Sequence, residues 1–336
     1  MPYSARAAAR VSRTLDARTV AYVSNFENEP AAVTRLAHGR TLLGNSPEVL
    51  RRARNPALLA QLLAARGFVV PAIRTSAPLS AARKWVRKPR RSGGGHGVRR
   101  WTGSPPLGRG EILQERIDGV PASIVFVSDG RRAVPLALTR QLVGERAFGA
   151  RGHLYCGNIL APAHDAMFAR AGELLVTAVA LARAATEALA LVGVNGIDVI
   201  ARDGAAWPLE LNPRWTASME LAERAFDISV FDAHARACAG RVPRFALGPA
   251  LARLDGAVGK AIVYARRDVV APDTRPWLDD PTVRDVPHPG ERIARGRPIC
   301  TIFARGGTGA ECHAALVRRA GALYEVLERG FPRRVA

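Results

Sequence analysis

Long apolar runs are missing from this chain of 336 residues, and none approaches the ~20 consecutive apolar residues that a membrane helix needs. The basic N-terminus, Met1 to Arg6, is not followed by the apolar core of a signal peptide. Cysteine is also scarce, and no two of the four cysteines form a Cys-x-x-Cys pair. These absences argue against a membrane partner, export, a disulfide framework and a zinc site. We therefore expect a cytoplasmic protein.

Lysine is nearly absent. Of 49 lysines and arginines only Lys84, Lys88 and Lys260 are lysine, which leaves 46 arginines. The formal charge of +20 could attract a phosphate backbone, but the arginines form no long basic block and no stripe interleaved with aromatics. We interpret the charge as a compositional bias and expect no nucleic-acid partner.

The length allows a large core divided into two to four lobes, and 48% hydrophobic with 6% aromatic residues is typical of a globular α/β protein. One helix has clear end signals: Asn55 can cap its start, Pro56 suits its first turn, and Gly67 suits its C-terminal end. The sequence predicts helices over 55–67, 163–191, 219–226 and 310–328. It predicts strands over 19–24, 40–44, 85–88, 98–101, 111–117, 123–130, 133–138, 196–201, 207–211, 260–264 and 298–303. This order favours α+β lobes over a doubly wound parallel sheet.

A lysine and a glycine loop follow the strand expected over 85–88. Lys88 lies in Trp-Val-Arg-Lys-Pro, and Ser-Gly-Gly-Gly-His-Gly follows at 92–97. Glycines let backbone N–H groups approach phosphate oxygens closely, and Lys88 would supply a fixed cation. The segment is neither a P-loop nor a dinucleotide fingerprint. The alternative is a flexible surface loop, but its place directly after Trp-Val-Arg-Lys-Pro favours a phosphate site.

Oxygen ligands gather on the hairpin expected over 196–211. Asp198 and Glu210 lie on neighbouring strands, and Asn212 shares a face with Glu210. Carboxylates with phosphate oxygens are the usual ligands of Mg²⁺. Arg214 follows where it could meet developing negative charge. The alternative is a solvated hairpin face with a chance ion pair.

In this order and spacing, these motifs resemble the ATP-grasp superfamily over roughly residues 55 to 240. The resemblance implies ATP held between two α+β subdomains, with adenine bound by backbone near Glu115 and Ile117. It implies two Mg²⁺ ions on Asp198, Glu210 and Asn212, with Arg214 and Lys88 as catalytic residues. The ATP-binding residues it implies are Lys88, Ser92, Gly93, Gly94, Gly95, His96, Gly97, Gln114, Glu115, Arg116, Ile117 and Asp118.

The same resemblance divides the chain into four parts. These are an N-terminal α/β lobe (1–75), a central lid subdomain with the glycine loop (76–118), the main subdomain with the metal site (119–244) and a C-terminal β-rich lobe (245–336). The last part is similar to the small β lobe of carboxylase-like relatives.

Two departures stand out. Relatives often carry a further phosphate-contacting lysine where this chain has Arg54-Asn55-Pro56, so that Arg52 or Arg54 is the candidate replacement. They also place a ribose-binding glutamate where this chain has Pro-Ala-Ser at 121–123, and Asp118 is the candidate there.

The implied reaction forms an acyl phosphate from a carboxylate and ATP, which an amine then attacks. The segment 210–220 resembles ATP-grasp ligases of methanogens and methylotrophs. The substrates expected on that resemblance are glutamate with tyramine or tyrosine, in the biosynthesis of a methanofuran-type C1-carrier cofactor. A carboxylase similar to that of purine synthesis and a non-enzymatic basic binding protein are the alternatives. A homodimer is the default oligomer.

Further polar residues have both a functional and a structural interpretation. Lys260 could bind a substrate carboxylate, although a surface charge at a strand end is favoured. His96 could touch a phosphate or serve as a spacer. The stretch that carries Glu145, Arg146 and 151–153 could be a substrate loop or an exposed mobile connector. Arg140 and Gln141 precede this stretch and could orient an acid.

Overall fold

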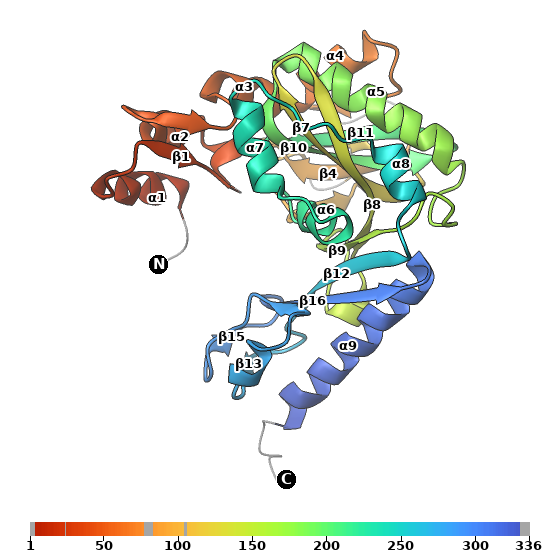
Figure 1. Ribbon diagram of the computed structural model, residues 1–336. Helices are drawn as coiled ribbons and strands as arrows, with labels where there is room; N and C mark the ends of the chain where they lie inside the picture. The colour runs from red at the N-terminus through yellow and green to blue at the C-terminus, as the bar shows by residue number, and fades with distance from the viewer. Residues whose placement is uncertain (1–3, 24, 77–82, 104–105, 330–336) are drawn as a thin grey trace.

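The computed structural model describes residues 4–23, 25–76, 83–103 and 106–329, and places three hydrophobic cores along the chain (Figure 1). The first lies in an N-terminal lobe, where Ala9, Val33 and Leu50 are fully buried. Its helices are α1 (Ala5–Val11), α2 (Pro30–Ala37) and α3 (Pro47–Ala53), and its parallel strands are β1 (Thr19–Ala21) and β2 (Thr41–Leu43). Helix α4 (Pro56–Ala64) follows, and the Asn55 side chain caps it as predicted by accepting from the Leu58 N–H.

A small antiparallel sheet comes next, in the order β3-β6-β4-β5. Its strands are β3 (Ile73–Arg74), β4 (Trp85–Pro89), β5 (Arg99–Arg100) and β6 (Glu111–Glu115). Strands β4 and β5 pair as a hairpin around the glycine loop, as the sequence predicts. Short 3₁₀ helices lie at Ser12–Thr14, Phe26–Asn28, Arg146–Phe148 and Arg275–Trp277.

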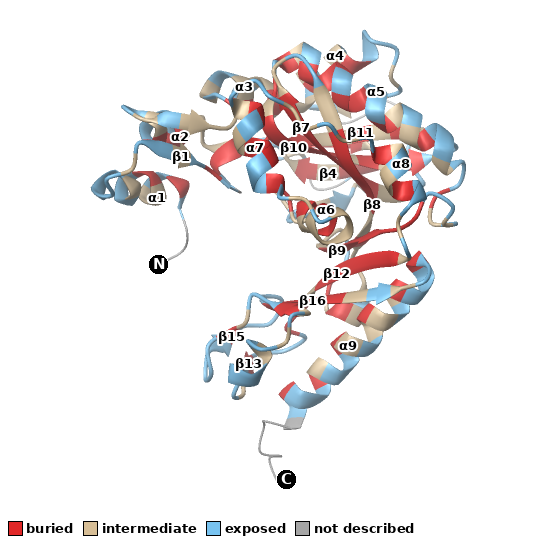
Figure 2. Cartoon of the chain, viewed as in Figure 1, coloured by how far each residue is buried: buried red, intermediate tan, exposed pale blue. Residues whose placement is uncertain are grey.

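The large sheet is eight-stranded, in the order β11-β10-β7-β8-β9-β12-β16-β14, and every neighbouring pair is antiparallel. Its central strands are among the most deeply buried parts of the protein (Figure 2). The strands are β7 (Val120–Asp129), β8 (Ala133–Val143), β9 (Tyr155–Leu160), β10 (Val192–Arg202), β11 (Ala205–Asn212), β12 (Ala257–Tyr264), β14 (Val283–Arg284) and β16 (Pro298–Gly306). This architecture confirms the expected mixed α+β fold.

Helices α5 (Ala171–Leu189), α6 (Met219–Phe226), α7 (Val230–Cys238) and α8 (Leu247–Ala252) pack on the large sheet and form the second core with it. The helix predicted over 163–191 is too long at its start. The Asp165 side chain accepts from the backbone N–H groups of Met167 and Gly309, both at 2.8 Å, and so holds this segment in a turn. Strand β9 was missed, because the sequence predicts no element over residues 155–160.

The C-terminal part supplies the third core. Helix α9 (Gly309–Arg329) packs on β12 and β16, beside a two-stranded ribbon of β13 (Val269–Val270) and β15 (Arg292–Ile293). Strand β12 hydrogen-bonds to β9, so that this part continues the large sheet (Figure 1). The subdomain boundaries given above stay a prediction. Among the described helices, none has the length and apolar character needed to cross a bilayer.

Candidate active site

Lys88 lies in β4 and reaches across to the metal-ligand hairpin. Its ammonium donates to the Leu209 carbonyl oxygen of β11 at 3.3 Å, and the Gln114 side chain donates to the same oxygen at 3.0 Å. Burial lowers the pKa of Lys88, while the nearby Glu210 and Asp198 carboxylates oppose that shift. The lysine and the two carboxylates, predicted from segments about a hundred residues apart, therefore lie together.

Asp198 and Glu210 face each other on β10 and β11. Asp198 accepts hydrogen bonds from the Asn212 amide at 2.9 Å and the Gln141 amide at 2.8 Å. Burial, together with the Glu210 charge, raises the pKa of Asp198 to about 6. Two close carboxylates resist ionising together, and a divalent cation relieves that repulsion.

These residues fit Mg²⁺. Among the described residues, no group of three His, Cys, Asp or Glu side chains could hold a metal. The predicted ligand set consists of two carboxylates and the Asn212 amide. Such a set suits an ion that takes its remaining ligands from phosphate oxygens and water. When bound, the ion would neutralise phosphoryl charge.

Arg214 is held beside this set by a partner that the sequence gave no reason to expect. Its Nε donates to Glu27 Oε1 at 2.7 Å, and its Nη2 donates to Asn212 Oδ1 at 3.3 Å. Glu27 is only 1% exposed, and its Oε2 is buried without a hydrogen-bond partner among the described residues. It lies in a 3₁₀ helix of the N-terminal lobe and belongs to no motif, so only the three-dimensional arrangement identifies it.

The glycine loop, residues 92–97, lies beside Arg214 and against the segment around His153. A Cβ on Gly93 would lie 3.9 Å from Arg214 Nη2, and the Tyr155 N–H donates to the Gly94 carbonyl oxygen at 3.0 Å. Gly95 has φ +77°, and a Cβ there would lie 1.7 Å from the His153 carbonyl oxygen. Glycine is therefore required at this position, both for the backbone conformation and for the close approach. The His96 side chain is exposed.

Of the two arginines proposed to replace the missing lysine, only Arg54 reaches the site. It donates to the carbonyl oxygens of Ser92 at 2.9 Å and Leu211 at 3.2 Å, and lies 3.9 Å from Glu210. Arg54 thus joins the glycine loop to β11. Arg52 instead donates to the Ala188 carbonyl oxygen at the end of α5.

The residues predicted to bind adenine lie at the end of β6. Glu115 accepts from the Ala72 N–H at 3.1 Å and pairs with Arg83 at 2.8 Å, so its carboxylate is already engaged. Asp118 pairs with Lys84 at 3.0 Å and Arg116 at 3.1 Å, and the hydrogen bond from Lys84 lowers the pKa of this exposed carboxyl group. Ile117 is half-buried between them. The roles of these residues stay predictions.

One structural interpretation was wrong. Lys260 is not a surface charge: it lies in the middle of β12, is 5% exposed, and donates to Glu220 Oε2 at 2.7 Å. The two interpretations of the connector between β8 and β9 stay predictions. Glu145 pairs there with His313 of α9 at 2.6 Å, and the segment around His153 contacts the glycine loop. Arg146 and Arg151 in the connector are exposed, and Arg140 is half-buried.

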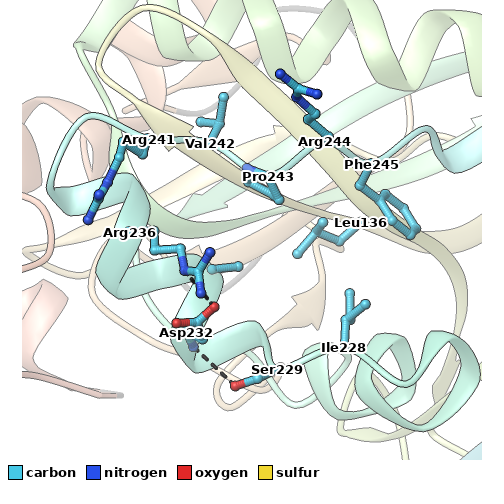
Figure 3. A pocket seen from close by; sticks show the side chains of 11 residues that line it. Leu136, Ile228, Ser229, Asp232, Arg236, Arg241, Val242, Pro243, Arg244 and Phe245 are labelled. Atoms are coloured by element: carbon cyan, nitrogen blue, oxygen red, sulfur yellow. Dashed lines mark hydrogen bonds and ion pairs between the residues drawn. The ribbon is translucent and has the colours of Figure 1, made fainter.

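A pocket of about 800 Å³ lies elsewhere, between α7 and the segment 241–245 (Figure 3). Arg236, Arg241 and Arg244 border it, above an apolar floor that includes Leu136 and Phe245. None of its lining residues belongs to the predicted site. The candidate active site, where the predicted side chains converge, therefore lies apart from this pocket.

The family model of the ATP-grasp domain matches residues 53–218. This segment, just under half of the chain, is similar to the ATP-grasp domain. The match spans the glycine loop, Lys88, the β10–β11 hairpin and Arg214. An ATP-grasp domain is typical of ADP-forming ligases and carboxylases that use ATP and Mg²⁺. No curated protein sequence is significantly similar to the chain.

Solved structures share the ATP-grasp fold at low identity. Pyruvate carboxylase from Rhizobium etli matches with a TM-score of 0.71 and 15% identity over 98% of this chain, which spans 33% of that protein. L-amino acid ligase from Bacillus licheniformis matches with a TM-score of 0.66 and 16% identity, and the match covers 95% of this chain and 84% of that protein. Carboxyaminoimidazole ribonucleotide synthase from Aspergillus clavatus, complexed with ATP, matches with a TM-score of 0.68 and 16% identity. This match covers 96% of this chain and 85% of that protein. At these identities the likeness shows the fold alone.

Proposed function

We propose that the chain is a carboxylate–amine ligase that uses Mg-ATP to form an acyl phosphate and releases ADP. The observation that carries the proposal is the convergence of Asp198, Glu210, Asn212, Lys88 and Arg214 within the ATP-grasp domain. These side chains supply oxygen ligands and fixed cations, the two things that transfer of a phosphoryl group requires. We see no covalent nucleophile in the chain, and this chemistry needs none.

Each residue has a separate role in this proposal. Asp198, Glu210 and Asn212 hold Mg²⁺, and Lys88 contacts the phosphates beneath the loop Ser92–Gly97. Arg214 meets the charge that develops on the transferred group and its acceptor. The backbone near Glu115 and Ile117 contacts adenine, and Arg54 takes the place of the missing lysine. A loop that excludes water would protect the acyl phosphate from hydrolysis.

For the substrates we propose glutamate with tyramine or tyrosine, in the biosynthesis of a methanofuran-type cofactor of C1 metabolism. The support is the resemblance of the segment 210–220 to such ligases, and a fold shared with an L-amino acid ligase agrees with an amino-acid substrate. Both partners would be small molecules, bound by a cytoplasmic enzyme whose default oligomer is a dimer.

The decisive experiment measures ADP release with Mg-ATP over pairs of carboxylates and amines. Glutamate with tyramine or tyrosine is tested first, and bicarbonate alone is a separate reaction. We expect turnover that needs both an acid and an amine. Turnover with bicarbonate alone would instead identify a carboxylase, and salt-sensitive nucleic-acid binding without ATP turnover would identify a binding protein.

The metal assignment has its own test. Asp198→Asn and Glu210→Gln should abolish Mg²⁺-dependent turnover while the melting temperature changes little, because each keeps its shape and loses a charge. Asp203→Asn is the matched control, since this carboxylate lies in the turn of the same hairpin with its side chain 79% exposed. Unchanged turnover in either site variant would refute the assignment.

A further inference from the structure

Lys260, Glu220 and Arg224 form a cluster between β12 and helix α6, which we call the Glu220 cluster. Lys260 Nζ lies 2.7 Å from Glu220 Oε2, and Arg224 Nη2 lies 3.5 Å from Glu220 Oε1. The Arg224 guanidinium also stacks over Phe303 of β16, with Cζ 3.7 Å from the ring centroid. The Lys260 side chain is 7% exposed, and those of Arg224 and Glu220 are 27% and 28% exposed.

The cluster has an excess of positive charge. Glu220 is the only carboxylate that pairs with either Lys260 or Arg224 in the described part of the chain, so two cations share one anion. Arg305 adds a further guanidinium, which donates to the Arg224 carbonyl oxygen at 3.1 Å. The Arg224 guanidinium is only 27% exposed, so that a second anion beside it would stabilise the surplus charge. The cluster therefore has the charge of an anion site.

The use of lysine in this cluster is also informative. Arginine supplies almost every positive charge in this chain, and the other two lysines are Lys84 and Lys88, on either side of the start of β4. Lysine is a compact cation that presents three donors to a ligand from one nitrogen. In a chain with 46 arginines, a buried lysine is the exception.

A row of polar side chains connects the cluster to the metal site. Gln141 donates to Asp198, Asn158 lies opposite Gln141 on β9, and Lys260 lies opposite Asn158 on β12. Two strand spacings, ~10 Å, separate Gln141 from Lys260 along this row. Helix α6, which carries Glu220 and Arg224, begins seven residues after the last metal ligand and packs across β8, β9 and β12.

Tyr155 connects the two ends more directly. Its hydroxyl donates to Asn158 Oδ1, and the Asn158 amide donates to Thr139 Oγ1 at 2.8 Å. Burial raises the pKa of Tyr155, and the carboxylates of both Asp198 and Glu220 add to the shift. The phenol is thus hydrogen-bonded within the polar row that runs between the metal site and the Glu220 cluster.

We propose that the Glu220 cluster is an anion subsite, which binds a second carboxylate of the acid whose first carboxylate is phosphorylated at the metal site. The inference rests on the ligase function proposed above, and it assigns a place in the fold to the second carboxylate of an acid such as glutamate. The carboxylate would contact Lys260 and Arg224 and neutralise the surplus charge, while Glu220 holds both cations in place. Acids with one carboxylate would leave the surplus charge uncompensated.

Binding is measured first, because it does not depend on turnover. L-glutamate, glutarate and inorganic phosphate are titrated by calorimetry into the full chain with Mg²⁺ and a non-hydrolysable ATP analogue, and L-glutamine serves as the monocarboxylate comparison. We expect the dissociation constant of a dicarboxylate to be at least about 10-fold lower for wild type than for Lys260→Met or Arg224→Gln, because each variant loses a charged hydrogen bond to the ligand. Arg275→Met is the matched control, because Arg275 pairs with Asp273 on the surface with its side chain 78% exposed.

The outcomes separate the two proposals. If no dicarboxylate binds wild type more tightly than the two cluster variants, the anion subsite is refuted, whether or not the chain ligates. If only phosphate shows this dependence, the cluster takes a phosphorylated substrate and the dicarboxylate assignment is wrong. If dicarboxylates bind as expected but ADP is never released, the ligase function fails and the subsite stands. In steady-state assays the variants should raise KM for the acid and leave KM for ATP unchanged.

Discussion

The guanidinium Nε of Arg214 lies 2.7 Å from Oε1 of Glu27, a carboxylate that is 1% exposed. This contact ties the N-terminal lobe to the residue proposed to stabilise the transferred phosphoryl group. Breaking a buried ion pair from one side costs about 3–5 kcal/mol, because the partner charge stays buried. The N-terminal lobe is therefore part of the active-site architecture.

We predict that Glu27→Gln lowers both stability and turnover. The free energy of unfolding should fall by about 3 kcal/mol, and kcat by about 10-fold or more, because Arg214 loses its neutralising partner. Chemical denaturation and ADP release measure the two effects. Glu29→Gln is the control, since Glu29 pairs with Arg6 at the surface and should change neither.

Substitution of Arg54 and of Arg52, the two candidates for the role of the phosphate-contacting lysine, should have different effects on ATP binding. Arg54→Gln should raise KM for ATP by about 10-fold or more, because it frees the Ser92 carbonyl oxygen from β11 and removes a charge beside Glu210. Arg52→Gln should leave KM for ATP unchanged, because its contact is with Ala188. Equal effects from both would show that Arg54 acts only through stability.

Gly95→Ala should weaken ATP binding by preventing the loop from docking. Its Cβ would lie 1.7 Å from the His153 carbonyl oxygen, so that the loop has to move away from the connector. Gly290→Ala carries a similar strain at φ +80° but meets nothing within 4 Å, and is the matched control. We expect a raised KM for ATP in the first variant alone. Loss of ATP affinity in both would mean that backbone strain, and not docking, is responsible.

The cysteines should be unreactive in the folded protein. Burial raises the pKa of Cys156, Cys300 and Cys312 to about 12 and that of Cys238 to about 11. A thiol reagent at about pH 8 should therefore react slowly with the native chain and rapidly in denaturant. Rapid labelling of the native protein would contradict this.

The same shifts predict an alkaline loss of stability. An unfolded thiol ionises near pH 8.5, about three units below the buried ones, so the contribution of burial is complete below that pH. It is lost progressively as the pH rises toward 12. Denaturation measured over this range would reveal the slope, which Cys→Ala variants should reduce.

The parts of the site that local signals specify could be predicted from the sequence. The β10–β11 hairpin turns at Asp203 and Gly204, both with positive φ, and a β-bulge between Val199 and Asp198 then shifts the register so that Asp198 lies opposite Glu210. The glycine loop has a similar local signature. Both were predicted because the residues that determine them lie within a few positions of one another.

The parts that depend on distant contacts could not be predicted. Nothing near Glu27 in the sequence indicates Arg214, and nothing near Lys260 indicates Glu220. Likewise, the pairing of β9 with β12 joins segments about a hundred residues apart. In each case packing selects the partner, and a single sequence records only the residue type.

The pairing of β12 with β9 has a consequence for dissecting the enzyme. A chain cut near residue 244 would lose β12 and leave β9 as a sheet edge, with Cys156, Ile159 and Leu160 fully buried in the intact protein. Unpaired edges next to newly exposed apolar side chains invite intermolecular strand pairing. The ATP-grasp region alone would then precipitate as it refolds, and a proteolytic nick in the 241–246 segment would leave two fragments that stay associated.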